Sequence, residues 1–183
     1  TGEAREVMHF ALLLGYGASA VTAPPSPDRF DVVVYGGNAA GVVAAVQAKR
    51  MGRSVVLLEP GKYLGGLTTG GLGATDIGNK AAIGGVSREF YHRIAQHYAR
   101  DDAWKWETRA DYFTKRGSGQ AKASDLGSSD ATMWTFEPHV AEQIFWDLTR
   151  ESKVPVYLGH LLGSVTKHVL FETRCDMLVA PER

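Results

Sequence analysis

The stretch from Asp31 to Gly66 reads DVVVYGGNAAGVVAAVQAKRMGRSVVLLEPGKYLGG, and the order of its parts decides the fold. Residues 31–35 and 54–59 each contain an uninterrupted apolar run, as in strands buried on both faces of a parallel sheet. Between them, a glycine-rich turn at 36–41 leads into apolar residues at helical spacing, which predict a helix ending near Gly52. This order predicts an α/β fold with a Rossmann-like βαβ unit that binds a dinucleotide.

The turn from Gly36 to Gly41 has the spacing of a pyrophosphate site. A helix N-terminus supplies unpaired N–H groups and the positive end of the helix dipole, and glycines let the backbone approach phosphates. We expect Gly36 to make the sharp turn out of the strand and Gly41 to let the helix pack closely on it. Asn38 replaces the middle glycine of the G-x-G-x-x-G pattern, and its side-chain amide can donate to a phosphate oxygen.

Glu59 stands at the end of the second predicted strand, 23 residues after Gly36. A carboxylate at this place accepts hydrogen bonds from ribose hydroxyls and repels a 2′-phosphate, which disfavours NADP. The alternative interpretation of Glu59 is a solvated strand end. Pro60 follows directly and belongs to the same predicted site.

A glycine turn alone is a weak signal, because methyltransferases and nicotinamide enzymes also carry one after a first strand. Here Gly65 and Gly66 follow Glu59 by six and seven residues. With GGLTTGGLGATD at 65–76 and WTFEP at 134–138, the chain resembles the FAD-dependent oxidoreductases, and among them a bacterial group that is often exported. The resemblance extends over residues 30–167.

The resemblance implies that the chain binds FAD, with the loop from Gly65 to Thr69 running toward the flavin. It implies a flavin that takes a hydride from a small-molecule substrate, and a strand pair within 154–165 that brings backbone to the adenine side. The cofactor-binding residues expected from the turn, the acid and the resemblance together are Gly36, Gly37, Asn38, Ala39, Ala40, Gly41, Glu59, Pro60, Gly65, Gly66, Leu67, Thr68 and Thr69.

The members of this group are several times longer, so we expect an N-terminal portion of an FAD-binding domain without a complete active site. No catalytic residue is assigned, because His139 and His160 are lone histidines with no visible partner. Thr68, Thr69 and Asp76 are either ring or substrate contacts or structural turn residues. Two other functions stay open: a non-catalytic nucleotide-binding fragment, and an NAD-dependent enzyme.

The ends of the chain differ from this central portion. Residues 1–23 contain Arg5, a short apolar run and then small residues, an order typical of a secretory signal peptide and too short to span a bilayer. The alternatives are a disordered tail or a short buried helix. The proline-rich residues 24–29 predict a linker. Residues 168–183 show no clear helical or strand periodicity and do not resemble the FAD-dependent oxidoreductases. The expected location is therefore secreted or periplasmic, and otherwise cytoplasmic.

Composition narrows the chemistry. The 20 basic residues balance the 20 acidic ones. The sequence contains no run of basic residues, so nothing in it indicates a nucleic-acid partner. The single cysteine, Cys175, rules out an internal disulfide and a cysteine-based zinc site. His92 and His97 lie five residues apart on a predicted helix, so they do not form a metal pair, and no metal site is expected.

Two further helices are predicted. Ser87 is expected to cap a helix on which Phe90, Ile94 and Tyr98 recur at core spacing, and Pro138 is expected to begin a helix. Trp104 and Trp106 lie between these helices in a charged setting. They line a substrate entrance or pack locally, and composition favours packing.

Overall fold

The computed structural model describes residues 20–22, 30–76, 78–115 and 126–160. Contacts group the chain into two units, one comprising Thr1–Gly66 with Trp146–Arg183 and the other Leu67–Phe145, and each is described by itself. The predictions for residues 1–19, 23–29 and 161–183, which include most of the signal-like segment, the linker and the unassigned tail, lie outside the described residues.

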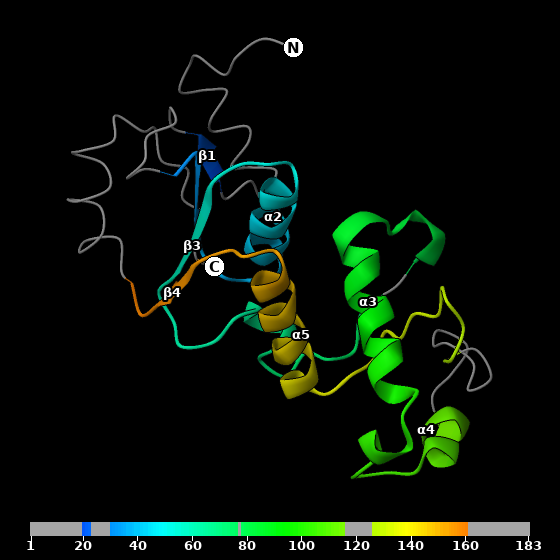
Figure 1. Ribbon diagram of the computed structural model, residues 1–183. Helices are drawn as coiled ribbons and strands as arrows, with labels where there is room; N and C mark the ends of the chain where they lie inside the picture. The colour runs from blue at the N-terminus through cyan, green and yellow to red at the C-terminus, as the bar shows by residue number, and fades with distance from the viewer. Residues whose placement is uncertain (1–19, 23–29, 77, 116–125, 161–183) are drawn as a thin grey trace. The chain divides into compact units, whose positions relative to one another are not determined.

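The first unit is built on a four-stranded sheet in the order β1–β2–β3–β4 (Figure 1). Strands β2 (Val32–Tyr35), β3 (Val55–Glu59) and β4 (Val156–Leu158) run parallel to one another. Strand β1 (Ala20–Thr22) pairs antiparallel with β2, so these three residues, predicted to lie outside the fold, are part of the sheet. The parallel strands with helix α2 between the first two confirm the predicted α/β, Rossmann-like fold.

Helix α2 (Ala39–Arg50) packs on β2 and β3 and has capping residues at both ends. Its buried face includes Val42, Ala45 and Val46. At its end, Gly52 has a φ of +82° and its N–H donates to the carbonyl of Lys49 at 3.0 Å, the Schellman arrangement that favours glycine. The predicted helix end at Gly52 is confirmed.

The start of the sheet is held by a reciprocal pair. The N–H of Asp31 donates to Ser54 Oγ, and the N–H of Ser54 donates to Asp31 Oδ2, both at 2.8 Å. Hydrogen bonding to the carboxyl by the backbone N–H of Ser54, and next by its side chain, lowers the pKa of Asp31 below its usual value. The pair sets β2 and β3 in register, with Val34 opposite Leu57.

The second unit is mainly helical. It contains η2 (Lys80–Ala82), α3 (Gly85–Tyr98), η3 (Asp101–Ala103) and α4 (Arg109–Lys115), while η1 (Gly66–Thr68) begins at the boundary and α5 (Pro138–Glu151) crosses it. Helix α5 begins at Pro138 as predicted. The prediction that Ser87 caps α3 is wrong, because Gly84 occupies the N-cap position and Ser87 lies inside the first turn.

Aromatic rings form the core of this unit. Phe90 of α3 stacks on Phe145 of α5 with a centroid distance of 4.6 Å and meets the edge of Phe136 at 5.6 Å. Tyr91 lies 4.1 Å from Trp134, and both Ile94 and Trp134 are buried. Phe90, Ile94 and Tyr98 are all buried, so their predicted place in the core is confirmed.

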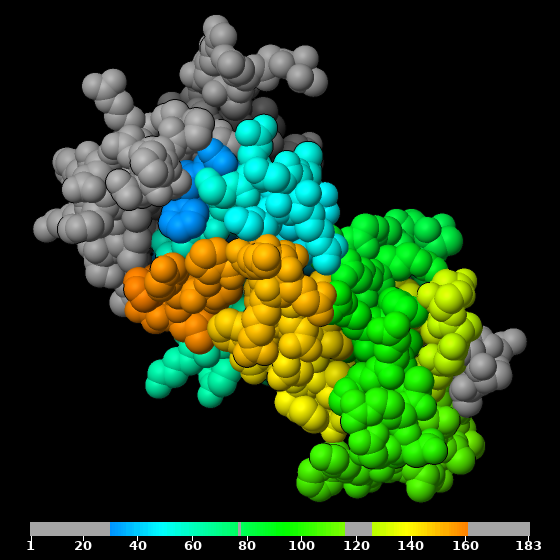
Figure 2. All heavy atoms as spheres, viewed as in Figure 1, coloured from blue at the N-terminus to red at the C-terminus, as the bar shows by residue number. Residues whose placement is uncertain are grey.

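The two sequence motifs that carried the family resemblance meet in this unit. Ala74 forms an antiparallel bridge with Thr135, the N–H of Thr75 donates to Trp134 O at 3.0 Å, and the N–H of Phe136 donates to Gly73 O at 2.9 Å. Residues 126–136, yellow in Figures 1 and 2, lie along the green helix α3. The motifs therefore stabilise each other although at least 58 positions separate them in sequence (Trp134 minus Asp76).

Candidate cofactor site

The glycine turn lies at the carboxyl ends of β2 and β3. Gly36 has a φ of +100°, a left-handed conformation that suits glycine, and its N–H donates to Leu58 O at 2.8 Å. A Cβ on Gly41 would lie 1.9 Å from the carbonyl oxygen of Gly36, so only glycine allows α2 to start this close to the turn. Both local roles predicted for these glycines agree with the geometry.

Asn38 takes the middle position of the glycine pattern without needing a glycine conformation. Its φ of −66° and ψ of 175° are ordinary extended backbone. Its Oδ1 accepts a hydrogen bond from the N–H of Gly41 at 2.9 Å, so the residue caps α2. The expected donation by the side-chain amide to a phosphate stays a prediction.

The N-terminus of α2 points its first N–H groups out of the helix. The N–H groups of Gly41 and Val42 are satisfied by Asn38, through its Oδ1 and its carbonyl oxygen. The N–H groups of Ala39 and Ala40 lie in the first turn of α2, where no helix carbonyl is in position to accept from them. The first turn of α2 contains no acidic residue, so its positive dipole end is not neutralised locally.

Glu59 folds back onto the turn. Its Oε2 accepts a hydrogen bond from the N–H of Gly37, and its Oε1 accepts one from the N–H of Gly61 at 2.5 Å. A Cβ on Gly37 would lie 2.7 Å from Leu64 Cδ2 and 3.1 Å from Glu59 Cβ. The carboxylate predicted for the ribose therefore lies directly beside the turn, followed by the half-buried Pro60.

The second glycine pair closes the other side of the turn. The N–H of Gly65 donates to Gly37 O at 2.7 Å, and Gly65 forms a parallel bridge with Asn38. Gly65 and Gly66 have φ angles of +103° and +57°, and a Cβ on Gly66 would lie 3.0 Å from Asn38 Cβ. The structure thus brings together three separate parts of the predicted site within one unit.

The backbone after β4 also reaches this site. The N–H of Gly159 donates to Gly61 O at 2.9 Å, and the N–H of His160 donates to Glu59 O at 3.1 Å. His160, expected to be a lone histidine, has a ring nitrogen, Nδ1, 2.8 Å from Leu158 O. The sequence analysis expected backbone from within 154–165 near the cofactor but assigned neither Gly159 nor His160 to the site. The glycine after the predicted strand was the available signal, and Gly159 has a φ of +72°.

The remaining predicted residues, Leu67, Thr68 and Thr69, belong to the second unit. The carbonyl oxygen of Leu67 accepts hydrogen bonds from the N–H groups of Gly70 at 3.2 Å and Leu72 at 3.3 Å, which close a tight turn. The Leu67 side chain is 74% exposed, whereas Thr68 and Thr69 are half-buried. Their expected roles at the flavin stay predictions.

The residues of the first unit fit the phosphate and ribose parts of a dinucleotide. Backbone donors and a positive helix end suit a pyrophosphate. Gly36 leaves open space beside the turn, and Gly41 lets α2 begin close to it. The carboxylate of Glu59 is an acceptor next to them. In the described ranges, no group of three or more His, Cys, Asp or Glu residues is arranged to hold a metal ion. Among these same residues there is also no helix with the length and apolar character needed to cross a membrane.

Comparison with known proteins identifies the family. The family described as FAD dependent oxidoreductase matches residues 31–180. The chain therefore belongs to the FAD-dependent oxidoreductase family, and its cofactor is FAD.

Two known proteins share parts of the chain. A vinyl phenol reductase of Lactiplantibacillus plantarum is 49% identical over 51 residues, which are 27% of this chain and 10% of the relative. The solved structure of a 3-ketosteroid-Δ4-(5α)-dehydrogenase from Rhodococcus jostii RHA1, in complex with 4-androstene-3,17-dione, is 16% identical, with a TM-score of 0.35. That match covers 76% of this chain and 40% of the dehydrogenase chain.

Proposed function

We propose that the first unit binds the pyrophosphate of FAD at residues 36–41 and the adenosine ribose at Glu59. The observation that carries this proposal is the convergence of the glycine turn, Glu59 and the Gly65–Gly66 pair, joined by hydrogen bonds to Gly37. The N–H groups of Ala39 and Ala40 would donate to the phosphate oxygens, where the dipole of α2 adds favourable charge.

Glu59 can serve the ribose while it keeps its present contacts. An ionised carboxylate has about four acceptor positions, and the backbone N–H groups of Gly37 and Gly61 occupy one on each oxygen. The remaining lone pairs can accept from the two ribose hydroxyls. The same charge would repel the 2′-phosphate of NADP, which supports FAD binding by this site.

We further propose that residues 67–69 contact the flavin end of the cofactor and that the whole protein transfers a hydride from a small-molecule substrate to FAD. The flavin supplies the hydride chemistry, and the protein binds and orients it. The family supports an oxidoreductase, and the curated relative is named as a reductase. The matched segment spans only 10% of that relative. The substrate of this protein therefore has to be found by assaying the protein itself.

The test is a titration of the chain with FAD, followed by flavin fluorescence. We expect saturable binding, and Glu59→Gln should weaken it at least about tenfold, because a hydrogen bond to a charged group contributes roughly 1.5–3 kcal/mol. Glu142→Gln is the matched control, since Glu142 lies on α5 and not at the turn. A chain that takes up no FAD, or equal FAD affinities of Glu59→Gln and wild type, would contradict the proposal.

Competition distinguishes the other two functions. NAD should displace FAD only weakly, and tighter NAD binding would favour an NAD-dependent enzyme. ADP should compete well, because the proposed contacts are to the ADP part of FAD. Riboflavin, which lacks the pyrophosphate and adenosine, should bind wild type and Glu59→Gln equally. FAD binding without reduction by any electron donor would favour a non-catalytic nucleotide-binding role.

A further inference from the structure

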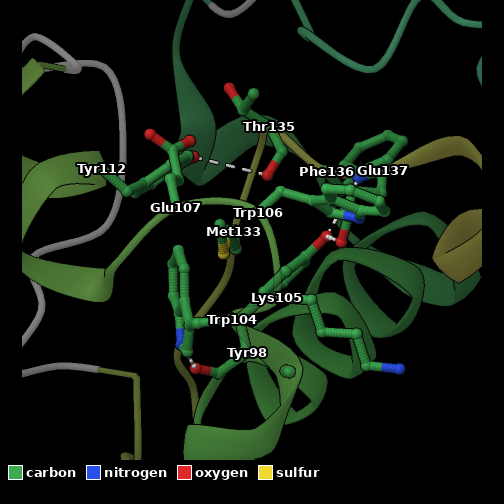
Figure 3. Close-up of a pocket in the computed structure, with 11 residues that line it drawn as sticks. Tyr98, Trp104, Lys105, Trp106, Glu107, Tyr112, Met133, Thr135, Phe136 and Glu137 are labelled. Atoms are coloured by element: carbon green, nitrogen blue, oxygen red, sulfur yellow. Dashed lines mark hydrogen bonds between the residues drawn. The ribbon is translucent and has the colours of Figure 1, made fainter.

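The second unit contains a cavity of about 140 Å³ that is separate from the residues of the proposed cofactor site (Figure 3). Its walls come from α3, from residues 103–107, from α4 and from residues 133–137. Five aromatic side chains dominate the lining: Tyr98, Trp104, Trp106, Tyr112 and Phe136.

Most of this aromatic lining is held in place by hydrogen bonds. Trp104 Nε1–H donates to Tyr98 O at 3.0 Å, and the Tyr98 hydroxyl donates to Glu137 Oε2 at 2.9 Å. The Tyr112 hydroxyl donates to Thr135 O at 3.4 Å. The rings of Tyr98 and Tyr112 lie 5.2 and 5.3 Å from the ring of Trp104. A ligand would therefore meet walls that are already ordered, which lowers the entropic cost of binding.

Trp106 differs from this ordered group. Its side chain is 86% exposed, and in the part of the chain that the structure describes it joins no aromatic pair. The sequence prediction of local packing therefore fits Trp104 but not Trp106. Its ring stands in water at the edge of the cavity, where a bound ligand would cover it.

Among the residues that line the cavity, carboxylates outnumber ammonium groups. Glu107 and Glu137 contribute two carboxylates to the lining, whereas Lys105 is its single ammonium group, and Figure 3 shows that group directed away from the rings. Lys115 lies 3.7 Å from Glu107 in an exposed pair, which is weak in water. Burial raises the pKa of the Tyr98 phenol, so this lining hydroxyl stays neutral.

One of these rings, that of Trp104, already faces a cation in the structure. The guanidinium carbon of Arg109 lies 6.0 Å from the centroid of Trp104. The faces of tryptophan and tyrosine rings attract cations through their quadrupole, most strongly where water is excluded. Arg109 faces the ring of Trp104. Within the described residues, no cation lies over the ring of Trp106.

We propose that this cavity binds a small organic cation with an alkylated ammonium head group. Its volume of about 140 Å³ is close to the roughly 150 Å³ of a protein cavity that holds one benzene molecule. A trimethylammonium group with its attached carbon is of similar size. The rings would surround the methyl groups, and the carboxylates of Glu107 and Glu137 would balance the charge.

Choline and 3,3-dimethylbutan-1-ol provide the test, because they have nearly the same shape but differ in charge. Isothermal titration calorimetry with the full chain should show that choline binds at least about fivefold tighter than the neutral alcohol, a difference at the upper end of the range for exposed cation–π contacts. Tetramethylammonium chloride should compete with choline, and the same concentration of potassium chloride should not.

Two variants test the site itself. Trp106→Leu should weaken choline binding roughly three- to tenfold, since it removes one cation–π contact. Glu107→Gln should weaken choline binding and leave the neutral alcohol unaffected. Tyr63→Leu is the control, because Tyr63 is 68% exposed and lies outside the cavity. Equal binding of choline and the alcohol, no choline binding, or equal choline affinities of Trp106→Leu and Tyr63→Leu would overturn the proposal.

Discussion

Replacing Gly41 by alanine tests the closest approach in the proposed cofactor site. The added Cβ would lie 1.9 Å from the carbonyl oxygen of Gly36 and 3.4 Å from Val34 Cγ1. The shortest ordinary C···O contacts are about 3.3 Å, so the two atoms would have to separate by roughly 1.4 Å. Because the oxygen belongs to the backbone, this separation requires α2 or the turn to move.

Two effects of opposite sign set the magnitude. Overpacking of this kind costs about 1–3 kcal/mol, and the severe contact favours the upper part of that range. Alanine in place of glycine in a helix gains at most about 1 kcal/mol. We therefore expect Gly41→Ala to lose about 1–2 kcal/mol of unfolding free energy, which would lower the urea midpoint by roughly 0.5–1 M.

The assay is urea unfolding followed by circular dichroism, combined with the FAD titration. Gly78→Ala is the control, because its added Cβ would meet no atom within 4 Å and its φ lies outside the left-handed region. The control should keep the wild-type midpoint, whereas Gly41→Ala should lose both stability and FAD affinity. A midpoint of Gly41→Ala equal to or above that of wild type would refute the close approach of α2 to the turn.

Two further changes test the second unit. Phe145→Ala should lose about 3–5 kcal/mol in urea unfolding, because Phe145 is buried and stacks on Phe90, and a loss below about 1 kcal/mol would contradict this packing. Burial, with added repulsion from Arg100 and His139, lowers the pKa of His97. The unfolded chain therefore binds this proton more readily, and stability should fall as pH drops below the usual value of 6.5. His97→Gln should lose less stability than wild type between about pH 7.5 and 5.5, and an identical pH dependence would contradict the shift.

Much of the first unit was predictable because its signals are local. Apolar runs ending at Tyr35 and Glu59 define strands, and Gly52 defines a helix end, through preferences that act over a few residues. The acid and the glycine pair were predictable as site residues because their spacing from the turn reflects the length of one βαβ unit.

Other features were not predictable from local signals. Ser87 is a good capping residue, but Gly84 takes the N-cap position because the helix begins two residues before Ser87. The pairing of β1 with β2 joins residues ten or more positions apart, and no local preference specifies such a partner. Trp104 and Trp106 look alike in sequence, and only the surrounding contacts of α3 and α4 separate a packed ring from an exposed one.

The sequence by itself determined the βαβ order, the glycine turn, the acid at the second strand end and the family, since these depend on residue type and short spacing. Only the tertiary structure decided that Glu59 and Gly65 both bond to Gly37, and that backbone from beyond β4 lies beside Glu59. Hydrogen bonds between distant segments depend on where the folded chain brings their donors and acceptors, and that placement is set by the packing of the whole unit.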